Sequence, residues 1–212
     1  MTSILLAESA RPQQGAGFDR EVNMSEAIEV RFVGPFSWPG TPDAPSIFQV
    51  DEGDKAGIYL WTIALSEGHI VYYVGETGRS FATRMFEHYK EHAAATYHVF
   101  SPTEFARGEK IELWPGCRDQ VDCIANYSRL TDSIYGMTQI LRFLVAPMSC
   151  DLRIRHRIEA AKANTLYAVP GMIGAFQDKG IRYYPRRHDE APIDCTIASQ
   201  QPIQGLPPQI SV

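Results

Sequence analysis

The sequence GIYLWTIALSEGHIVYYV at residues 57–74 contains two apolar runs that are separated by a short polar stretch. Residues 57–65 are mostly apolar on both alternating faces, and this pattern predicts a central strand that is covered on both sides. Residues 70–74 predict a second strand. Because only a short stretch with one glycine connects the two runs, the sequence predicts a β-hairpin.

Two loop lengths are open for this hairpin, and they differ in which side chains share a face. A two-residue Glu-Gly turn is one of them. A three-residue loop over 66–68 would instead place Gly68 at the left-handed position that such loops need. We prefer the longer loop, which sets Tyr73 opposite Trp61 on the face that carries Tyr59. The two-residue turn would put the two tyrosines on opposite faces.

A helix is expected directly after the hairpin. Ser80 is a suitable N-cap, and the helical pattern continues to about Ala94. One stripe of this helix is apolar and is expected to face the core: Ala82, Met85, Phe86, Tyr89 and Ala93. The opposite side is polar and is expected to point away from that stripe: Arg84, His88, Glu91 and His92. Arg84 and His88 lie one turn apart on this polar side.

Weaker patterns predict the elements in the rest of the chain. We expect strands at 29–33 and 109–114, a short helix from Ser101 to Gly108, long helices at 130–146 and 152–168, and short extended segments at 173–176 and 181–184. Aperiodic or proline-rich stretches predict a mobile N-terminal tail at 1–24, an N-terminal arm at 25–53 and a C-terminal tail at 188–212. Residues 54–187 then form the expected domain.

The composition excludes several classes of protein. With 212 residues, of which 44% are hydrophobic and 21% charged, the chain is neither disordered throughout nor collagen-like. No apolar run approaches the roughly 18–20 residues of a membrane span, and the first residues lack a secretory pattern, so we expect a cytoplasmic protein with no membrane partner. The four cysteines occur singly, without a C-x-x-C pair, which is typical of inert thiols.

The net charge of −5 argues against binding of polyanions by the whole surface. Residues 141–187 are an exception, because they carry nine basic and three acidic side chains. A local positive patch can bind a phosphate backbone even on an acidic protein. The side chains of interest for nucleic-acid binding are Arg153, Arg155, Arg157, Lys162, Lys179, Arg182, Arg186 and Arg187. The alternative is a solvated helix face followed by a charged loop.

Two tripeptides of the hairpin, Gly57-Ile58-Tyr59 and Tyr73-Val74-Gly75, match the signature of the GIY-YIG nuclease superfamily. The match continues with Arg84 and His88 on the following helix, and with Glu159 in the run RIEAA on a later helix. Over about residues 55–168 the chain therefore resembles this superfamily.

The resemblance implies an α+β fold in which a small three-stranded antiparallel sheet is flanked by helices. Its strands would be residues 57–65, 70–75 and 109–114, in agreement with the apolar patterns. Residues 95–135 would be an insertion that reads the substrate.

The activity that the resemblance implies is phosphodiester hydrolysis, which needs a positioned water, a base and cations that face the phosphate. Glu159 would hold one divalent metal, Mg²⁺ or Mn²⁺, because Mg²⁺ takes one or two carboxylates and fills its other positions with water and phosphate oxygens. Arg84 would bind the scissile phosphate.

The two tyrosines and the histidine would complete that site. Tyr59 would orient the attacking water or act as a base, although a phenol is a base at neutral pH only where a nearby cation lowers its pKa from about 10. Tyr73 would bind the phosphate or share the water. His88 would shuttle a proton or contact the phosphate.

Each of these residues also has a structural interpretation. Tyr59 and Tyr73 would be ordinary aromatic residues of a sheet. Arg84 and His88 would belong to a solvated helix face. Glu159 would be the ion-pair partner of Arg155, four residues earlier on the same helix.

The leading hypothesis is thus a metal-dependent endonuclease that acts on DNA, of a restriction or repair type. The sequence contains no recognisable zinc finger, helix-turn-helix or other DNA-reading module. One alternative is a module of the same fold that binds nucleic acid or protein without catalysis. A nuclease that acts on RNA is a further alternative.

Overall fold

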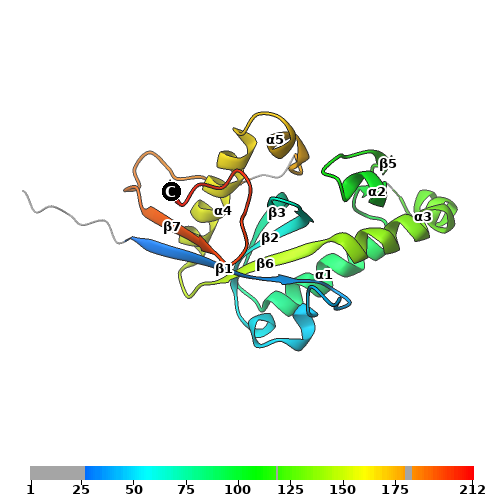
Figure 1. The fold of residues 1–212 in the computed structure, drawn as a ribbon, viewed down its shortest axis with the longest axis horizontal. Coiled ribbons are helices and arrows are strands. Elements are labelled where there is room, and N and C mark those ends of the chain that lie inside the picture. Colours follow the sequence, from blue (N-terminus) through cyan, green and yellow to red (C-terminus); the bar gives the residue numbers. More distant parts are fainter. Residues whose placement is uncertain (1–26, 118, 180–182) are drawn as a thin grey trace, which may run out of the picture.

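The computed structural model describes residues 27–117, 119–179 and 183–212. The expected tail at 1–24 and the side chain of Arg182 lie outside these ranges. The described chain forms one six-stranded mixed sheet, a separate two-stranded sheet and five α-helices (Figure 1). None of the helices within these ranges is long and apolar enough to cross a membrane.

The main sheet curls, so that β2 and β3 run at an angle to β1 (Figure 1). Its strands follow the order β3 (Gly68–Thr77), β2 (Gly57–Leu65), β6 (Arg142–Pro147), β1 (Ile28–Phe36), β7 (Asp194–Ser199) and β8 (Gln209–Ser211). β1 and β7 are parallel, and all other neighbours in this order are antiparallel. The small sheet pairs β4 (Val99–Phe100) with β5 (Glu112–Trp114).

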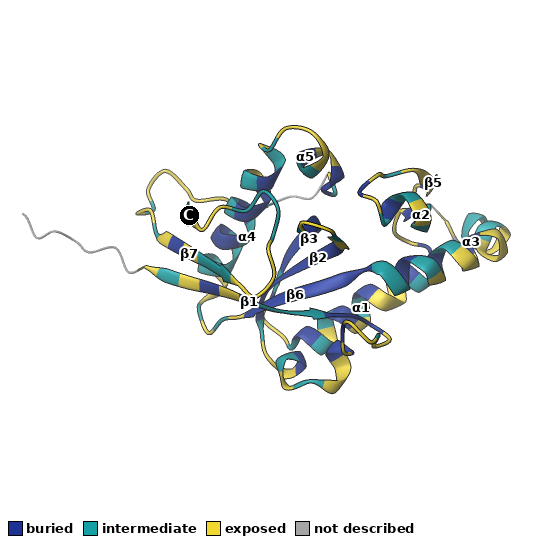
Figure 2. Ribbon diagram, viewed as in Figure 1, coloured by how far each residue is buried: buried dark blue, intermediate teal, exposed yellow. Residues whose placement is uncertain are grey.

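The helices are distributed over both faces of the main sheet. They are α1 (Phe81–Ala93), α2 (Pro102–Phe105), α3 (Gln120–Ile140), α4 (Leu152–Tyr167) and α5 (Met172–Phe176), and two short 3₁₀ helices precede β2 at Ile47–Gln49 and Asp51–Asp54. Side chains of α1, α2 and α3 pack with Tyr59 and Trp61 on one face of β2. Side chains of α4 pack with Ile58 and Leu60 on the other face. β2 is therefore buried on both faces and lies between β3 and β6, as its apolar pattern predicts (Figure 2).

The α+β class agrees with expectation, but the small three-stranded antiparallel sheet is wrong. The expected third strand, 109–114, contributes only β5 of the separate small sheet. The third strand beside the hairpin is β6, and all of it except Pro147 lies in the segment expected to be a helix at 130–146. Residues 143–146 are a continuous apolar run, and periodicity alone does not distinguish a buried strand from a buried helix in such a run. α3 instead ends at Ile140, after which Leu141 is extended.

Both ends of the described chain contribute strands to the main sheet. The strand expected at 29–33 is present as β1, which pairs with β6 and β7. The stretch expected to be a tail at 188–212 forms β7 and β8. Residues 173–176 are helical, as part of α5, and not extended. Residues 181 and 182 of the expected extended segment at 181–184 lie outside the described residues, and residues 183 and 184 belong to no helix or strand.

The hairpin register agrees with the preferred pairing for a different reason than expected. The turn is short, because Leu65 pairs with Gly68. A bulge between Trp61 and Thr62 then leaves Tyr72 as the extra residue of β3 and sets Trp61 opposite Tyr73. Beyond the bulge, the residues that face each other are therefore the same as a three-residue loop would have given.

α1 begins as expected but buries a different stripe. The hydroxyl of Ser80 accepts a hydrogen bond from the backbone N–H of Thr83, which confirms the N-cap. The buried stripe contains Phe81, Met85, His88 and His92, whereas Phe86 is 52% and Tyr89 38% exposed. The two histidines are buried because each has a hydrogen-bond partner inside, so the expectation that they face away from the core is wrong.

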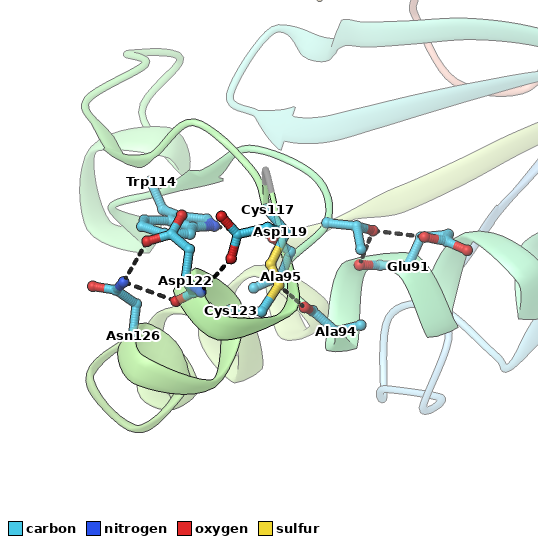
Figure 3. Close-up of a disulfide and its surroundings, with 10 residues drawn as sticks. Glu91, Ala94, Ala95, Trp114, Cys117, Asp119, Asp122, Cys123 and Asn126 are labelled. Carbon is cyan, nitrogen blue, oxygen red and sulfur yellow. Dashed lines mark hydrogen bonds between the residues drawn. A yellow bond between two sulfur atoms is a disulfide. The ribbon is translucent and has the colours of Figure 1, made fainter.

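A disulfide joins Cys117, which follows β5, to Cys123 in the first turns of α3 (Figure 3). The expectation of inert thiols is therefore wrong for this pair, while Cys150 and Cys195 are free. The backbone N–H of Cys117 also donates to the carbonyl of Ala95, just after α1. These links fasten the segment that carries Tyr97 between α1 and α3.

Candidate active site

The hydroxyl of Tyr59 is the centre of a hydrogen-bonded cluster. Tyr59 lies on β2 and its side chain is fully buried. Nε of Arg84 donates to the hydroxyl oxygen at 3.2 Å, and Nε2 of His88 lies 2.8 Å from the same oxygen. The ring of Tyr73 packs beside that of Tyr59, with centroids 5.9 Å apart. The two tyrosines, the arginine and the histidine of the sequence motif therefore form one unit.

His88 is held as a neutral imidazole within this cluster. Burial, followed by the charge of Arg84, lowers the pKa of His88 to about 3. Since Arg84 already donates to the hydroxyl of Tyr59, that hydroxyl can donate its own proton to Nε2 of His88. Nδ1 then carries the ring proton and donates to the hydroxyl of Tyr97, 3.0 Å away. His88 therefore positions two tyrosine hydroxyls.

Burial also keeps the tyrosines neutral. It raises the pKa of Tyr59 well above its usual value, and the opposing effect of Arg84 is smaller. Burial likewise raises the pKa of Tyr73. The condition for a phenolate base, a cation whose effect lowers the pKa below 10, is therefore not met at Tyr59.

A cavity of about 250 Å³ opens beside the cluster. Tyr73, Arg84 and His88 line it together with Tyr97, whereas Tyr59 lies behind them. Arg84 is also paired with Glu87, one turn further along α1, at 3.3 Å. Of the five motif residues, Tyr73, Arg84 and His88 can thus be reached by a ligand in the cavity, whereas Tyr59 does not line it.

Glu159 approaches from α4, which packs against the edge strand β3. Burial, followed by the negative charge of Glu76, raises the pKa of Glu159 to about 7. The charge of Arg84 acts on Glu159 in the opposite direction, and the charge of Glu159 acts on Tyr73. The fifth residue of the motif is therefore within electrostatic range of the cluster.

Arg155, which could have formed a structural ion pair with Glu159 on the same helix, pairs with Glu76 instead. Nε of Arg155 donates to the carboxylate of Glu76 at 2.9 Å, and Nη1 donates to the carbonyl of Cys150. A second ion-pair partner of Glu76 is His156, at 3.7 Å. Arg155 thus fixes α4 to β3 through Glu76 and not through an ion pair with Glu159.

The residues around Glu159 fit Mg²⁺ or Mn²⁺ if this one carboxylate is the protein's ligand and the other ligands are water and phosphate oxygens. Within the described ranges, no group of three or more His, Cys, Asp or Glu residues is arranged to hold a metal ion. Mg²⁺ does not need such a group, because one carboxylate suffices when water and phosphate oxygens complete the shell. Partial burial and the nearby carboxylate of Glu76 both disfavour the charged form of Glu159. A divalent cation would offset both effects, so the carboxylate of Glu159 is a suitable ligand.

Gly75 allows the hydroxyl of Tyr59 to reach its position. An ideal Cβ at residue 75 would overlap the ring and the hydroxyl oxygen of Tyr59. The backbone of Gly75 has no positive φ angle, so the requirement is for space and not for conformation. The glycine of the second tripeptide is therefore part of the site.

Replacing Gly75 by alanine is expected to displace the ring of Tyr59 and to lower the free energy of unfolding by about 1–3 kcal/mol, the usual cost of overpacking. Urea unfolding of the wild type and G75A measures this difference. G78A is a matched control, because a Cβ at residue 78 would meet only the flexible end of Arg155, at 2.9 Å. Equal losses in the two variants would contradict a specific need for space at residue 75.

Four of the seven described basic residues that were expected to bind nucleic acid are buried or paired within the protein. Lys162 and Arg157 are buried, and Nη2 of Arg157 donates to the carbonyls of Ala191 and Val212. Arg153 binds Glu190 and thereby lowers the pKa of that glutamate to about 2. Arg153 and Arg157 hold the C-terminal segment on α4, and Lys162 is enclosed in the core, so these three residues are not available to a phosphate backbone.

The remaining residues of the basic segment differ in exposure. Arg155 is committed to Glu76, as described above. Lys179, Arg186 and Arg187 are exposed, and Arg186 donates to the carbonyl of Glu190. The surface part of the expected patch is therefore reduced to these three side chains among the described residues.

Sequence reasoning missed three participants in the site: Trp61, Glu87 and Tyr97. Glu87 carried a usable signal, because it follows Arg84 by three residues on a helix. Trp61 had one as well, since it was expected opposite Tyr73. Tyr97 had none, because it lies in an irregular segment whose path depends on α3 and on the disulfide.

Comparison with protein-family models gave no match, and comparisons with curated proteins and with solved structures gave none either.

Proposed function

We propose that this protein is a metal-dependent endonuclease that hydrolyses phosphodiester bonds in DNA at the cluster of Tyr59, Tyr73, Arg84 and His88. The observation that carries the proposal is this cluster itself. Tyr59, Arg84 and His88 of the GIY-YIG-like motif share hydrogen bonds, the ring of Tyr73 packs beside Tyr59, and Glu159 is in electrostatic range. A sheet that merely needed aromatic packing would have no use for a network in which a buried tyrosine and a buried histidine bind a half-buried arginine.

Each residue has a role that follows from its position. Arg84 binds the non-bridging oxygens of the scissile phosphate and offsets the charge that develops there. The hydroxyl of Tyr73, on the cavity side, orients the attacking water. Tyr59 and His88 are neutral and act as positioning residues that fix Arg84 and Tyr73.

Glu159 would hold the divalent cation. When bound, Mg²⁺ would polarise the phosphate and favour deprotonation of the attacking water. Because the pKa of Glu159 is raised to about 7, its carboxyl is partly protonated at neutral pH without a cation. Hydrolysis adds the water oxygen to phosphorus, and the leaving sugar oxygen takes up a proton as its bond to phosphorus breaks.

The test is cleavage of a supercoiled plasmid and of a circular single strand in Mg²⁺ or Mn²⁺, with wild type and E159Q side by side. Glutamine keeps the size of Glu159 but removes its charge, so cleavage is expected to fall by about 10²-fold or more. Failure of the wild type to cleave either substrate in either metal, while it remains folded, would contradict the proposal.

One observation favours the alternative, a module of this fold that binds nucleic acid or protein without turnover. Glu87 already pairs with the guanidinium that a phosphate would occupy. A binding module would retain its ligand after Glu159→Gln and would show no metal-dependent nicking. The same assay, accompanied by a binding measurement, separates the two functions.

A further inference from the structure

The cavity beside Tyr73 and Arg84 has features that the hydrolysis itself does not use. Its walls are largely aromatic, with Trp61, Tyr72, Tyr73 and Tyr97 contributing rings. The ring centroids of Trp61 and Tyr73 are 5.7 Å apart. Flat rings on several sides favour a planar, aromatic ligand over an aliphatic or a spherical one.

The cavity also offers hydrogen bonds to the edge of such a ring. Asp178 and His98 line the same cavity. The carboxylate of Asp178 can accept hydrogen bonds, so it complements a ring that carries an amino group at its edge.

The size of the cavity limits its occupant to one small ring system. Its volume of about 250 Å³ lies below the roughly 300–1,000 Å³ of typical sites for drug-sized ligands. A single nucleobase fits this description, and a base pair does not. Because Arg84 lines the cavity, a base in it would be connected directly to a phosphate at the cleavage site.

We infer that this cavity receives an unpaired nucleobase of the strand that is cut, so that the preferred substrate has an unpaired nucleotide beside the scissile phosphate. The inference rests on the proposed function and specifies its substrate class. A base in a continuous duplex is stacked and paired and cannot enter such a cavity without leaving the helix. Single strands, bulges and flaps offer the base at no such cost.

The inference is tested by binding in EDTA, where no cleavage occurs. Three fluorescently labelled DNA hairpins are compared by anisotropy: a perfect duplex, the same duplex with one bulged nucleotide, and the same bulge with an abasic residue. We expect the bulged base to improve affinity about tenfold over both others, the usual effect of stacking one base on aromatic residues. Equal affinities for the three hairpins would overturn the inference.

Variants locate the effect in the cavity. Y97A removes one wall of the cavity and is expected to abolish the tenfold preference. D178N keeps the size of Asp178 but replaces a carboxylate oxygen with an amide, and it is expected to reduce the preference. F86A is the matched control, since Phe86 is an exposed aromatic residue outside the cavity and its loss should leave the preference intact. Circular dichroism checks that each variant is folded.

Competition with a mononucleotide distinguishes a base within a strand from a free nucleotide. Tighter binding of the mononucleotide than of the bulged hairpin would overturn the assignment to a strand. The two proposals can also fail separately. Cleavage of DNA without any effect of the base would refute only the cavity's role, and base-dependent binding without cleavage in any metal would refute only the nuclease.

Discussion

Replacing Arg84 by alanine is expected to lower the rate of DNA cleavage by about 10²–10³-fold, which is typical for removing one donor to transition-state charge. Arg84 is the cation of the cluster, because its Nε donates to Tyr59 and its side chain lines the cavity. Its guanidinium can bind a phosphate through two parallel hydrogen bonds, and a lysine ammonium cannot reproduce that geometry. R84K is therefore expected to remain close to R84A in rate.

The measurement is the single-turnover rate of plasmid nicking at saturating Mg²⁺. R79A is the matched control. Arg79 also binds Glu87, at 2.6 and 2.8 Å, but it is more exposed and makes no hydrogen bond to the tyrosine cluster in the described chain. We expect R79A to cleave nearly as fast as the wild type. Equal losses in R79A and R84A would mean that only general positive charge matters, and an unchanged rate in R84A would remove Arg84 from the chemistry.

The hairpin and its pairing were predictable because several local signals agree. Two apolar runs, a glycine and a short polar connection allow few arrangements, and the sequence places Tyr73 opposite Trp61 correctly. The bulge at Tyr72 that produces this register left no mark in the sequence. A bulge inserts one residue without a change of composition, so it shows only when both strands are placed.

The orientation of α1 was not predictable from amphipathicity. Phe86 and Tyr89 have the composition of a core stripe, and His88 has that of a surface. The structure reverses these assignments because the hydroxyl of Tyr59 offers His88 a buried partner. A polar group is buried where a hydrogen bond compensates its lost hydration, and the position of that bond depends on tertiary structure.

The outer strands of the sheet were not predictable from the sequence for a similar reason. β7 comes from residues with several nearby prolines, which resemble a tail when only local patterns are considered. It is held by long-range pairing with β1 and by Arg157, which donates to the carbonyl of Ala191. The same arginine was assigned to a nucleic-acid surface because charge counts ignore partners that lie far away in the sequence.

Replacing Lys162 by methionine is expected to stabilise the protein by about 3–5 kcal/mol at pH 7. Lys162 is 0% exposed, and its Nζ has no hydrogen-bond partner among the described residues. Its nearest compensation is the ring of Phe32, whose centroid lies 5.7 Å away. Burial lowers the pKa of Lys162 to about 7 from an ordinary 10.5, and one pKa unit corresponds to about 1.4 kcal/mol. Methionine has a similar length and carries no charge, so it removes this cost without leaving a large cavity.

The pH dependence distinguishes this cause from better packing. Between pH 7 and 10.5 the unfolded chain holds the lysine proton and the folded chain does not, so the wild type gains stability as the pH rises. The advantage of K162M is therefore expected to shrink by about 1.4 kcal/mol for each pH unit above 7. Urea unfolding at pH 7, 8 and 9 measures it, and K179M, at an exposed lysine, should match the wild type throughout. A constant advantage at all three pH values would attribute the gain to packing, and a loss of stability in K162M would mean that the ammonium group is compensated in the folded protein.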